Sequence, residues 1–420
     1  MTSPIVPTPP NHLILKARAV VPVDGPPLEN CAIAVDGNTI VAVGRSKDLE
    51  WLGAGEVHDL GDVVLLPGLI NAHCHLDYTM MRYAISPPKS FTAWVERINA
   101  LKRSLDSADY LKAIGRGFRQ LKKWGTTTVG NIESFPELMA RMTAPPIRTW
   151  WFYEMIDIRH RFTTEDVVAG ALSFFQGQSV SLSRFGLSPH APYTASQMLY
   201  KLANSCASTM TMQLTSHIAE STEEAAMFRD GSGPLYEFMR SLGRPMDDCG
   251  HGSVFSQLWR SGAINKNWLL VHMNELEEAD FQLLAGIIPD DLPSIVHCPG
   301  SHAYFGHSPF PYPRLRGLGV NICLGTDSLA STHSLSLFEE MRRFRESNPW
   351  VSSDEILKMV TINPARALRR ERRLGVIAPG ALADLIAIPV TGNLSTIYEE
   401  ILDYRDPVPW IMIDGKISPP

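Results

Sequence analysis

Two histidines, His73 and His75, are one residue apart and follow the apolar run Val63–Leu66 and the turn Pro67–Gly68. On an extended backbone alternate side chains leave the same face, so both imidazoles point to one side. Paired imidazoles at the end of a strand are suited to ligating a metal ion. The motif therefore predicts the beginning of a metal site.

Further candidate ligands follow in chain order, and each of them closes a short β-type run. They are His217, His272 and Asp327, which follow the runs Thr211–Ser216, Trp268–Val271 and Val320–Thr326. A catalytic zinc takes about three or four nitrogen or oxygen ligands, leaves a position for water and lowers the pKa of that water to roughly 7. The set that meets this need is His73, His75, His217 and Asp327.

Two more side chains are placed to move protons beside such a metal. Glu220 comes three residues after His217 in the segment HIAES, where the chain leaves the strand, so its carboxyl group is a candidate proton carrier. His272 is either a further ligand or a hydrogen-bond partner of the activated water. Asp327 has an alternative role, because Asp is common as the cap of a turn.

Apolar β-type runs alternate with helical patterns through the middle of the chain, which predicts repeated βα units. After the strand of His73, the predicted strands are Thr127–Asn131, Arg148–Glu154, Phe185–Ser188, Thr211–His217, Trp268–His272, Ser294–His297 and Val320–Gly325. The predicted helices are Phe91–Leu105, Asp109–Trp124, Ala195–Ser208, Thr222–Arg229, Glu275–Ala285 and Leu335–Glu346. Eight strands with helical crossovers indicate an α/β fold, a closed (β/α)8 TIM-type barrel with the ligands at the carboxyl ends of its strands.

The two ends of the chain have a different pattern. Residues from His12 to Leu66 alternate with a period of two and contain Asp-Gly turns, which is typical of antiparallel hairpins, and Ala383–Ile388 and Trp410–Asp414 do the same. We therefore expect a small β-sandwich domain built from both termini. The expected boundaries are 1–66 and 375–420 for this domain and 67–374 for the metal-dependent barrel.

Composition restricts the partners. The chain has 420 residues, 45% of them hydrophobic, and a formal net charge of −6, which provides no electrostatic footprint for nucleic acid. No stretch approaches the roughly 20 apolar residues of a membrane span. The six cysteines form no CxxC pair, and the start MTSPIVPTPPN lacks the features of a signal peptide. We expect a cytoplasmic protein with a small-molecule substrate, no nucleic-acid partner and no membrane contact.

Six segments together resemble the amidohydrolase superfamily, within it the mononuclear deaminases and chlorohydrolases that act on purine-type and triazine-type rings. These segments are LPGLINAHCHLD, GLSPHAPYT, HIAES, LLVHMN, VHCPGSH and LGTDSLAS. The resemblance implies one divalent metal, zinc or alternatively iron or manganese, with the ligands His73, His75, His217 and Asp327. It also implies Glu220 as proton shuttle, His272 beside the bound water and His190 facing the substrate. Barrels of this kind often pair, so a homodimer is compatible with the chain.

Two further segments indicate which group of deaminases the chain resembles. FTAWV after the first motif and FYEMI at the third strand resemble the 6-aminodeoxyfutalosine deaminases, whereas DYTMMRYAI departs from the acidic-aliphatic-Ser pattern expected after the paired histidines. The alternatives are a guanine or other aminoheterocycle deaminase, a triazine-type chlorohydrolase and, more remotely, a non-catalytic structural relative. No lysine ends the fourth strand, where FGLSPHAP offers only His190, so a carbamate-bridged two-metal centre is disfavoured.

The expected reaction is hydrolytic deamination of an aminopurine-type ring by a metal-activated water. Asp327 takes a proton from the water, His272 holds it, and Glu220 protonates the ring nitrogen beside the amine-bearing carbon. Phe91 and Trp94 are candidates for an apolar wall along the ring, with a core position as the alternative for both. Candidate clamps for a substrate carboxylate are Arg82, Arg159 and Arg161.

Overall fold

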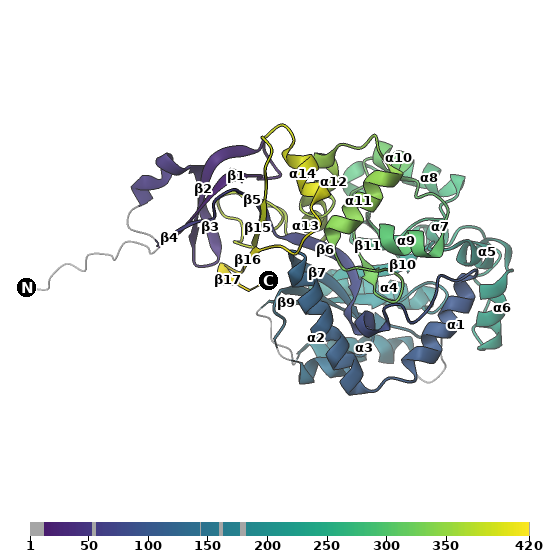
Figure 1. The fold of residues 1–420 in the computed structure, drawn as a ribbon. Coiled ribbons are helices and arrows are strands. Elements are labelled where there is room, and N and C mark those ends of the chain that lie inside the picture. The colour runs from purple at the N-terminus through teal and green to yellow at the C-terminus, as the bar shows by residue number, and fades with distance from the viewer. Residues whose placement is uncertain (1–11, 53–55, 143, 159–162, 177–181, 420) are drawn as a thin grey trace, which may run out of the picture.

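The protein folds into two sheets formed by different parts of the chain. The structure is a computed structural model that describes residues 12–52, 56–142, 144–158, 163–176 and 182–419. Strands from both ends of the chain share one sheet, in which the purple N-terminal strands lie beside the yellow C-terminal ones (Figure 1). The middle of the chain forms a second sheet with helices around it (Figure 1). This second sheet positions most of the candidate functional residues.

The second sheet is parallel throughout, and its neighbours follow the order β13-β12-β11-β10-β9-β8-β7-β6-β14. Its strands are β6 (Leu69–His75), β7 (Thr126–Glu133), β8 (Arg148–Met155), β9 (Ser183–Pro189), β10 (Gln213–Ile218), β11 (Trp268–His272), β12 (Ser294–His297), β13 (Ile322–Leu324) and β14 (Asp327–Ser328). Strands β6 to β12 confirm the seven predicted strands that they overlap. The curled parallel sheet with its surrounding helices fits a TIM-type barrel.

The last predicted strand, Val320–Gly325, contains β13, and the separate short strand β14 follows it. Strand β13 pairs with β12, whereas β14 pairs with β6 at the other end of the order. Only Gly325 and Thr326 separate the two strands, and the Thr326 backbone N–H donates to the carbonyl oxygen of His73 at 3.1 Å. This break brings Asp327 directly beside the strand that carries His73 and His75.

Every predicted helix overlaps a helix of the structure, and further helices lie between them. The α-helices are α1 (Phe91–Lys102), α2 (Ser107–Lys123), α3 (Thr164–Gln176), α4 (Gln197–Met210), α5 (Thr222–Asp230), α6 (Pro234–Ser241), α7 (Val254–Arg260), α8 (Glu278–Ala285), α9 (Pro299–Phe305), α10 (Tyr312–Gly317), α11 (Leu337–Ser347), α12 (Ser353–Lys358), α13 (Ile362–Ala367) and α14 (Ile397–Asp403). Short 3-10 helices occupy Ser46–Leu52, Leu76–Met81, Pro136–Arg141 and Pro289–Asp291. Within the described ranges, none of the helices combines the length and the apolar character that crossing a membrane requires.

Helix α2 illustrates why these segments are helical. Asp106 caps its N-terminus and forms a capping box with Asp109, which satisfies backbone N–H groups of the first turn. The apolar face contributes Ile114, Phe118 and Leu121 to the core. Gly125, with φ of 78°, follows the C-terminus in the left-handed conformation that glycine adopts without a steric penalty.

Strand β8 shows how the parallel sheet is buried on both faces. Trp150 and Phe152 belong to the core cluster inside the curled sheet, whereas Trp151 packs against Phe118 of α2 at a ring distance of 5.9 Å. The alternation of side chains along a strand separates these neighbours onto opposite faces. Gly186 on the adjacent β9 makes room for Phe152, because a Cβ atom there would lie 2.5 Å from the phenyl ring.

The terminal sheet has the order β17-β16-β15-β5-β1-β2-β3, with β4 also paired to β1. Its strands are β1 (Leu13–Val20), β2 (Leu28–Asp36), β3 (Thr39–Arg45), β4 (Glu56–Asp59), β5 (Val63–Pro67), β15 (Leu385–Pro389), β16 (Trp410–Ile413) and β17 (Lys416–Ser418). The antiparallel pairing predicted for the first three strands and for the C-terminal strands is confirmed. It is wrong for the contacts of β4 and β5 with β1, which are parallel because the chain crosses back after β3 before it adds these strands. On its other edge β5 pairs antiparallel with β15.

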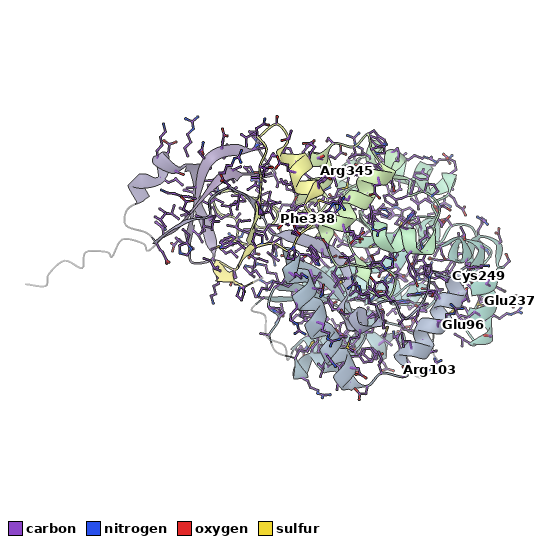
Figure 2. All side chains as sticks on the ribbon, viewed as in Figure 1. Glu96, Arg103, Glu237, Cys249, Phe338 and Arg345 are labelled. Atoms are coloured by element: carbon purple, nitrogen blue, oxygen red, sulfur yellow. The ribbon has the colours of Figure 1, made fainter. Side chains whose placement is uncertain are left out.

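A buried ion pair connects the two sheets. Arg148, the first residue of β8, binds the carboxylate of Asp384, which directly precedes β15, and also that of Asp414. Aromatic packing joins α11 to the segment that follows α14, where Phe338 lies against Tyr404 with ring centroids 5.3 Å apart. Figure 2 labels Phe338 and Arg345 of α11.

Candidate metal centre

His73, His75 and His217 approach one another at the carboxyl ends of β6 and β10. The Nε2 atoms of His75 and His217 are 3.2 Å apart, and all three side chains are buried. The Nδ1 atom of His217 lies 2.7 Å from the carbonyl oxygen of His190, so it carries the proton and donates it there. Its Nε2 is consequently a free lone pair, as a metal ligand requires.

Asp327 faces these histidines with one carboxylate oxygen. Its Oδ1 lies 3.7 Å from His73 Nε2 and 3.8 Å from His75 Nε2. Its Oδ2 accepts hydrogen bonds from the hydroxyl groups of Ser301, at 2.7 Å, and Ser331, at 2.9 Å. The two serines therefore orient the carboxylate so that Oδ1 remains available to a cation.

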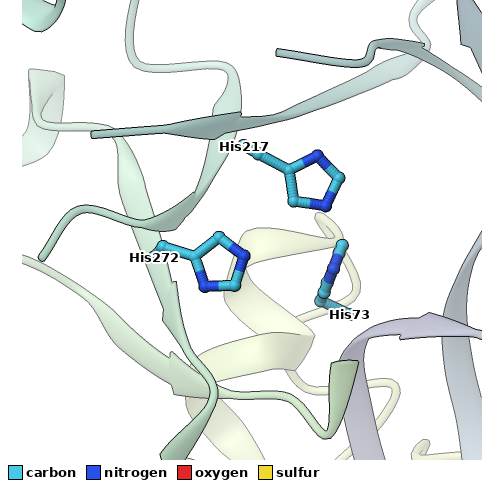
Figure 3. Close-up of side chains that lie close together, drawn as sticks. All are labelled: His73, His217 and His272. Atoms are coloured by element: carbon cyan, nitrogen blue, oxygen red, sulfur yellow. The ribbon is translucent and has the colours of Figure 1, made fainter. Parts of the chain in front are cut away.

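His272 reaches the same space from the end of β11. Figure 3 shows the imidazoles of His73, His217 and His272 turned toward one another. Ring nitrogens of these three residues lie within 4.8 Å of one another, and a second such group combines His73, His75 and Asp327. His272 and Asp327 have φ values of 74° and 54°, a backbone conformation uncommon for such residues and often found at functional sites.

The donor set fits a divalent metal ion. Among the described residues, neither ring nitrogen of His73 has a hydrogen-bond partner, although both atoms are buried. Burial lowers the pKa of His217 to about 3, with further lowering by His73 and His190, and burial also lowers the pKa of His75 and His272. The imidazoles therefore stay neutral at ordinary pH, which is the form that binds metal.

Glu220 lies beside His272, with Oε1 3.6 Å from Nε2. Its position is set by the loop after β10, where the carboxylate of Glu224 accepts the backbone N–H groups of Ala219 at 3.0 Å and Glu220 at 2.8 Å. Burial raises the pKa of Glu220 well above its usual value, and the charge of Asp327 raises it further. A carboxyl group that remains protonated is suited to act as a general acid.

A cavity of about 350 Å³ extends from these residues, within the range of small-molecule sites. Several predicted residues line it: His75, Phe91, Trp94, His190, His217, Glu220, His272 and Asp327. Phe91 and Trp94 border the cavity and also pack against Phe305 with ring distances of 5.5 and 5.0 Å. The histidines, Glu220 and Asp327 share this pocket with many apolar side chains.

His190 contributes to the site through both its backbone and its ring. Its carbonyl oxygen orients His217, while its Nδ1 lies 2.6 Å from the hydroxyl oxygen of Thr194. Its Nε2 is 4.0 Å from Oε1 of Glu154 on the cavity wall. The structure thus places His190 between the histidine cluster and Glu154.

Of the three arginine candidates, the structure describes Arg82, which does not line the cavity. Arg82 is exposed and donates to the backbone carbonyl of His333. Arg159 and Arg161 lie outside the described residues. The polar residues near the site that sequence reasoning missed are Glu154, Lys102, Glu224, Ser301 and Ser331. Glu154 had a usable signal, because an acidic residue near the end of a barrel strand is placed like a functional one.

Comparison with known proteins agrees with this geometry. The amidohydrolase family matches residues 64–417. The chain belongs to the amidohydrolase family. This amidohydrolase is 28% identical over 389 residues to a 5-methylthioadenosine/S-adenosylhomocysteine deaminase of Pyrococcus furiosus, covering 90% of this chain and 86% of the relative. It is 27% identical over 338 residues to an aminodeoxyfutalosine deaminase of Deinococcus radiodurans, covering 76% of each chain.

A solved structure of a deaminase has a similar fold. The amidohydrolase superimposes on an adenosine deaminase of Xanthomonas campestris with bound zinc, with a TM-score of 0.81 and 25% identity over 98% of this chain and 93% of the other. Family membership and the deaminase relatives support an enzyme that catalyses metal-dependent hydrolytic deamination of a small molecule.

Proposed function

We propose that this amidohydrolase removes the 6-amino group of an adenosine-type nucleoside substituted at its 5′ carbon, 6-aminodeoxyfutalosine or a related adenosine derivative. The observation that carries the proposal is one cavity that holds the histidine cluster, Asp327 and Glu220 at its polar end and apolar side chains along its walls. Deaminase relatives that act on 5′-substituted adenosines support the choice of substrate.

The ligands in this proposal are His73, His75, His217 and Asp327, and the metal is one zinc ion, with iron or manganese accepted by the same donor types. When bound, the ion would supply Lewis acidity and make a water molecule acidic near neutral pH. The proximity of His272 to both His73 and His217 allows it to act either as a fifth donor or as the group that holds the attacking water.

The residues of the chain divide the proton transfers between them. Glu220 donates a proton to the ring nitrogen beside the amine-bearing carbon, while Asp327 accepts the proton that the attacking water loses. His272 orients that water. Addition of water forms the carbon–oxygen bond. The proton held by Asp327 then passes to the amino group, the carbon–nitrogen bond breaks with release of ammonia, and Glu220 regains a proton from the new hydroxyl group as the carbonyl forms. Phe91, Trp94 and His190 position the ring during these steps.

We also propose the finer features of the fold. Strands β13 and β14 count as two parts of one eighth strand, which makes the parallel sheet a (β/α)8 barrel spanning 67–374. This is supported by their pairing with β12 and β6. The terminal sheet, from 1–66 and 375–420, forms a β-sandwich domain. A cytoplasmic location and a homodimer complete the proposal.

Ammonia release measured on a panel of aminoheterocycles tests the function. We expect 5′-methylthioadenosine and 6-aminodeoxyfutalosine to be deaminated with higher kcat/KM than adenine, guanine or a chlorotriazine. A preference for guanine would contradict the proposed substrate class and favour a guanine deaminase. Release of chloride from the triazine in place of ammonia would favour the chlorohydrolase alternative.

A further inference from the structure

Two charged side chains line the cavity beyond His190 and have no role in the proton transfers. Glu154 lies near the carboxyl end of β8, and Lys102 is the last residue of α1. The ammonium group of Lys102 donates a hydrogen bond to the hydroxyl oxygen of Tyr78 at 2.5 Å. Among the described residues, this is the one hydrogen bond of the Lys102 side chain. These residues form a polar patch on an otherwise apolar wall.

Glu154 is buried, with only 6% of its side chain exposed, yet it borders the cavity. Burial raises its pKa, but the charges of His190 and Lys102 outweigh that effect and hold the pKa below its usual value. An ionised carboxylate accepts hydrogen bonds and donates none. Its natural partner in the cavity is therefore a donor, such as a hydroxyl group of the ligand.

Lys102 changes which ligand group fits here. Its charge is close enough to lower the pKa of Glu154, so the ammonium and the carboxylate compensate each other. The nearby Asp77 is also buried, and among the described residues neither of its carboxyl oxygens has a hydrogen-bond partner. The negative charge of a ligand carboxylate would be repelled by these acidic groups, whereas a neutral diol would not be repelled. The patch favours hydroxyl groups over an anion.

The order of residues along the cavity matches the order of groups in a nucleoside. His217 belongs to the metal centre, the ring of His190 is 5.1 Å from that of His217, and His190 Nε2 is 4.0 Å from Glu154. We propose that Glu154 is a specificity-determining residue that accepts hydrogen bonds from the sugar hydroxyl groups of the substrate. The proposal rests on the function proposed above, since the base must occupy the metal end of the cavity for the sugar to reach Glu154.

The remaining wall is suited to the 5′ substituent. Apolar side chains of Ile156, Phe238 and Leu242 line the same cavity. Ile156 and Leu242 are 39% and 56% exposed, so they mark its opening to solvent. A sugar bound to Glu154 would direct its 5′ carbon to neighbouring apolar surface, where a methylthio or aromatic group loses contact with water.

The test compares adenosine with 2′,3′-dideoxyadenosine in the wild-type enzyme and in Glu154→Gln. A hydrogen bond to a charged group contributes about 1.5–3 kcal/mol, so we expect wild-type kcat/KM to favour adenosine by about 10- to 100-fold. In Glu154→Gln the preference should shrink toward equality, through loss of activity on adenosine alone. Retained turnover of dideoxyadenosine and unchanged metal content would show that the variant is folded.

Glu133→Gln is the matched control. Glu133 is a buried carboxyl group on β7 that does not line the cavity, so its replacement should leave the preference for adenosine unchanged. If Glu154→Gln loses the same factor on both nucleosides, or if the wild-type enzyme deaminates both equally, the inference is overturned while the proposed function stands. A wild-type enzyme that deaminates neither nucleoside and also leaves 5′-methylthioadenosine unchanged would overturn both.

Discussion

Two buried polar clusters of this protein differ in how completely their atoms are paired. At the junction of the sheets, both carboxylate oxygens of Asp384 accept hydrogen bonds, from the Arg148 guanidinium and the Asp414 backbone N–H. At the metal centre, neither ring nitrogen of His73 has a hydrogen-bond partner within the described part of the chain. The backbone N–H of Glu220 is bonded by the Glu224 carboxylate. Arg148 and Asp384 of the first cluster are as deeply buried as His73 and Glu220 of the second.

This difference in hydrogen bonding distinguishes a structural cluster from one that binds a ligand. Burying a polar group without a partner destabilises the fold, so nearly all such groups in proteins are paired. A cluster in which every atom is satisfied joins two parts of the chain. A cluster with unpaired nitrogens and a protonated carboxyl group is explained by a ligand that completes it. The following experiments test whether this distinction holds.

Removal of the metal should have the largest effect. Dialysis against a chelator is expected to abolish ammonia release, and added zinc should restore it, because the unpaired histidines lose the cation they are arranged to hold. Elemental analysis should give about one divalent metal per chain before dialysis. A preparation without metal that keeps its activity would contradict the assignment of the cluster.

Replacement of Glu220 tests the proton carrier. Glu220→Gln keeps the shape of the side chain but removes its acidity, and we expect kcat to fall by about 10²- to 10⁴-fold. Metal content and thermal stability should stay near wild type. The exposed Glu278→Gln on α8 is the control and should retain full activity. Equal activity of both variants would place the proton carrier elsewhere.

Replacement of Arg148 at the junction of the sheets should change the stability of the protein and leave its catalytic rate nearly unchanged. Arg148→Met leaves Asp384 buried without its cation, which should lower the free energy of unfolding by about 3–5 kcal/mol. Denaturant unfolding measures this loss, and kcat of the folded variant should change little. The control is Arg240→Met in the exposed pair with Glu237 on α6, where we expect a loss below about 1 kcal/mol. Similar losses in both variants would show that burial of the pair is unimportant.

The serines behind Asp327 should have an intermediate effect. Ser301→Ala removes one of the two hydroxyl groups that orient the carboxylate, and loss of such a partner typically reduces metal affinity or activity by about 10- to 100-fold. Metal titration and kcat/KM should both report the change. Ser208→Ala, an exposed serine of α4, should be neutral. An unaffected Ser301→Ala enzyme would mean that Ser331 alone orients Asp327.

Glu340 on α11 is paired less completely than Asp384 at the junction but more completely than the ring of His73. One of its carboxyl oxygens accepts the Gly300 N–H at 2.7 Å, and the other is buried without a partner among the described residues. Burial raises its pKa to about 8. Between its usual pKa and pH 8 the folded state therefore binds more protons than the unfolded state, so this group makes stability fall as pH rises.

Glu340→Gln should remove that dependence. Relative to the variant, wild-type stability should decline by up to about 1.4 kcal/mol per pH unit from pH 5 to 8, and the stability difference between the two proteins should become constant below about pH 4. Denaturant unfolding at several pH values measures both curves. Parallel curves over this range would show that Glu340 titrates normally.

Much of the framework could be predicted because strands carry strong local signals. The runs Trp268–His272 and Ser294–His297 are strands within the predicted bounds, since buried parallel strands are continuous apolar segments. Helices α6, α9 and α14 are short and were not predicted. The parallel pairing of β4 and β5 also escaped prediction, because the direction of pairing depends on where the chain returns and not on the alternation of its residues.

For the candidate site, prediction succeeded with residues whose type carries the chemistry. His73 and His75 are recognisable from their spacing, and Glu220 from its place after His217. Glu154 and Ser301 belong to no recognisable sequence motif. Their place in the site becomes visible only in the structure, where Glu154 borders the cavity and Ser301 donates to Asp327. Arg82 illustrates the converse, since a cationic side chain in a suitable loop donates to the His333 carbonyl on the surface.

The sequence alone determined the donor types, their chain order and their positions at strand ends, because alternation along a strand is a local property of the backbone. Only the tertiary structure decided that His272 joins the same group as His73, that two serines hold Asp327, and that Glu154 borders the cavity. The physical reason is that these relations depend on distances between residues far apart in the chain. Packing of the curled sheet sets those distances, and no local pattern encodes them.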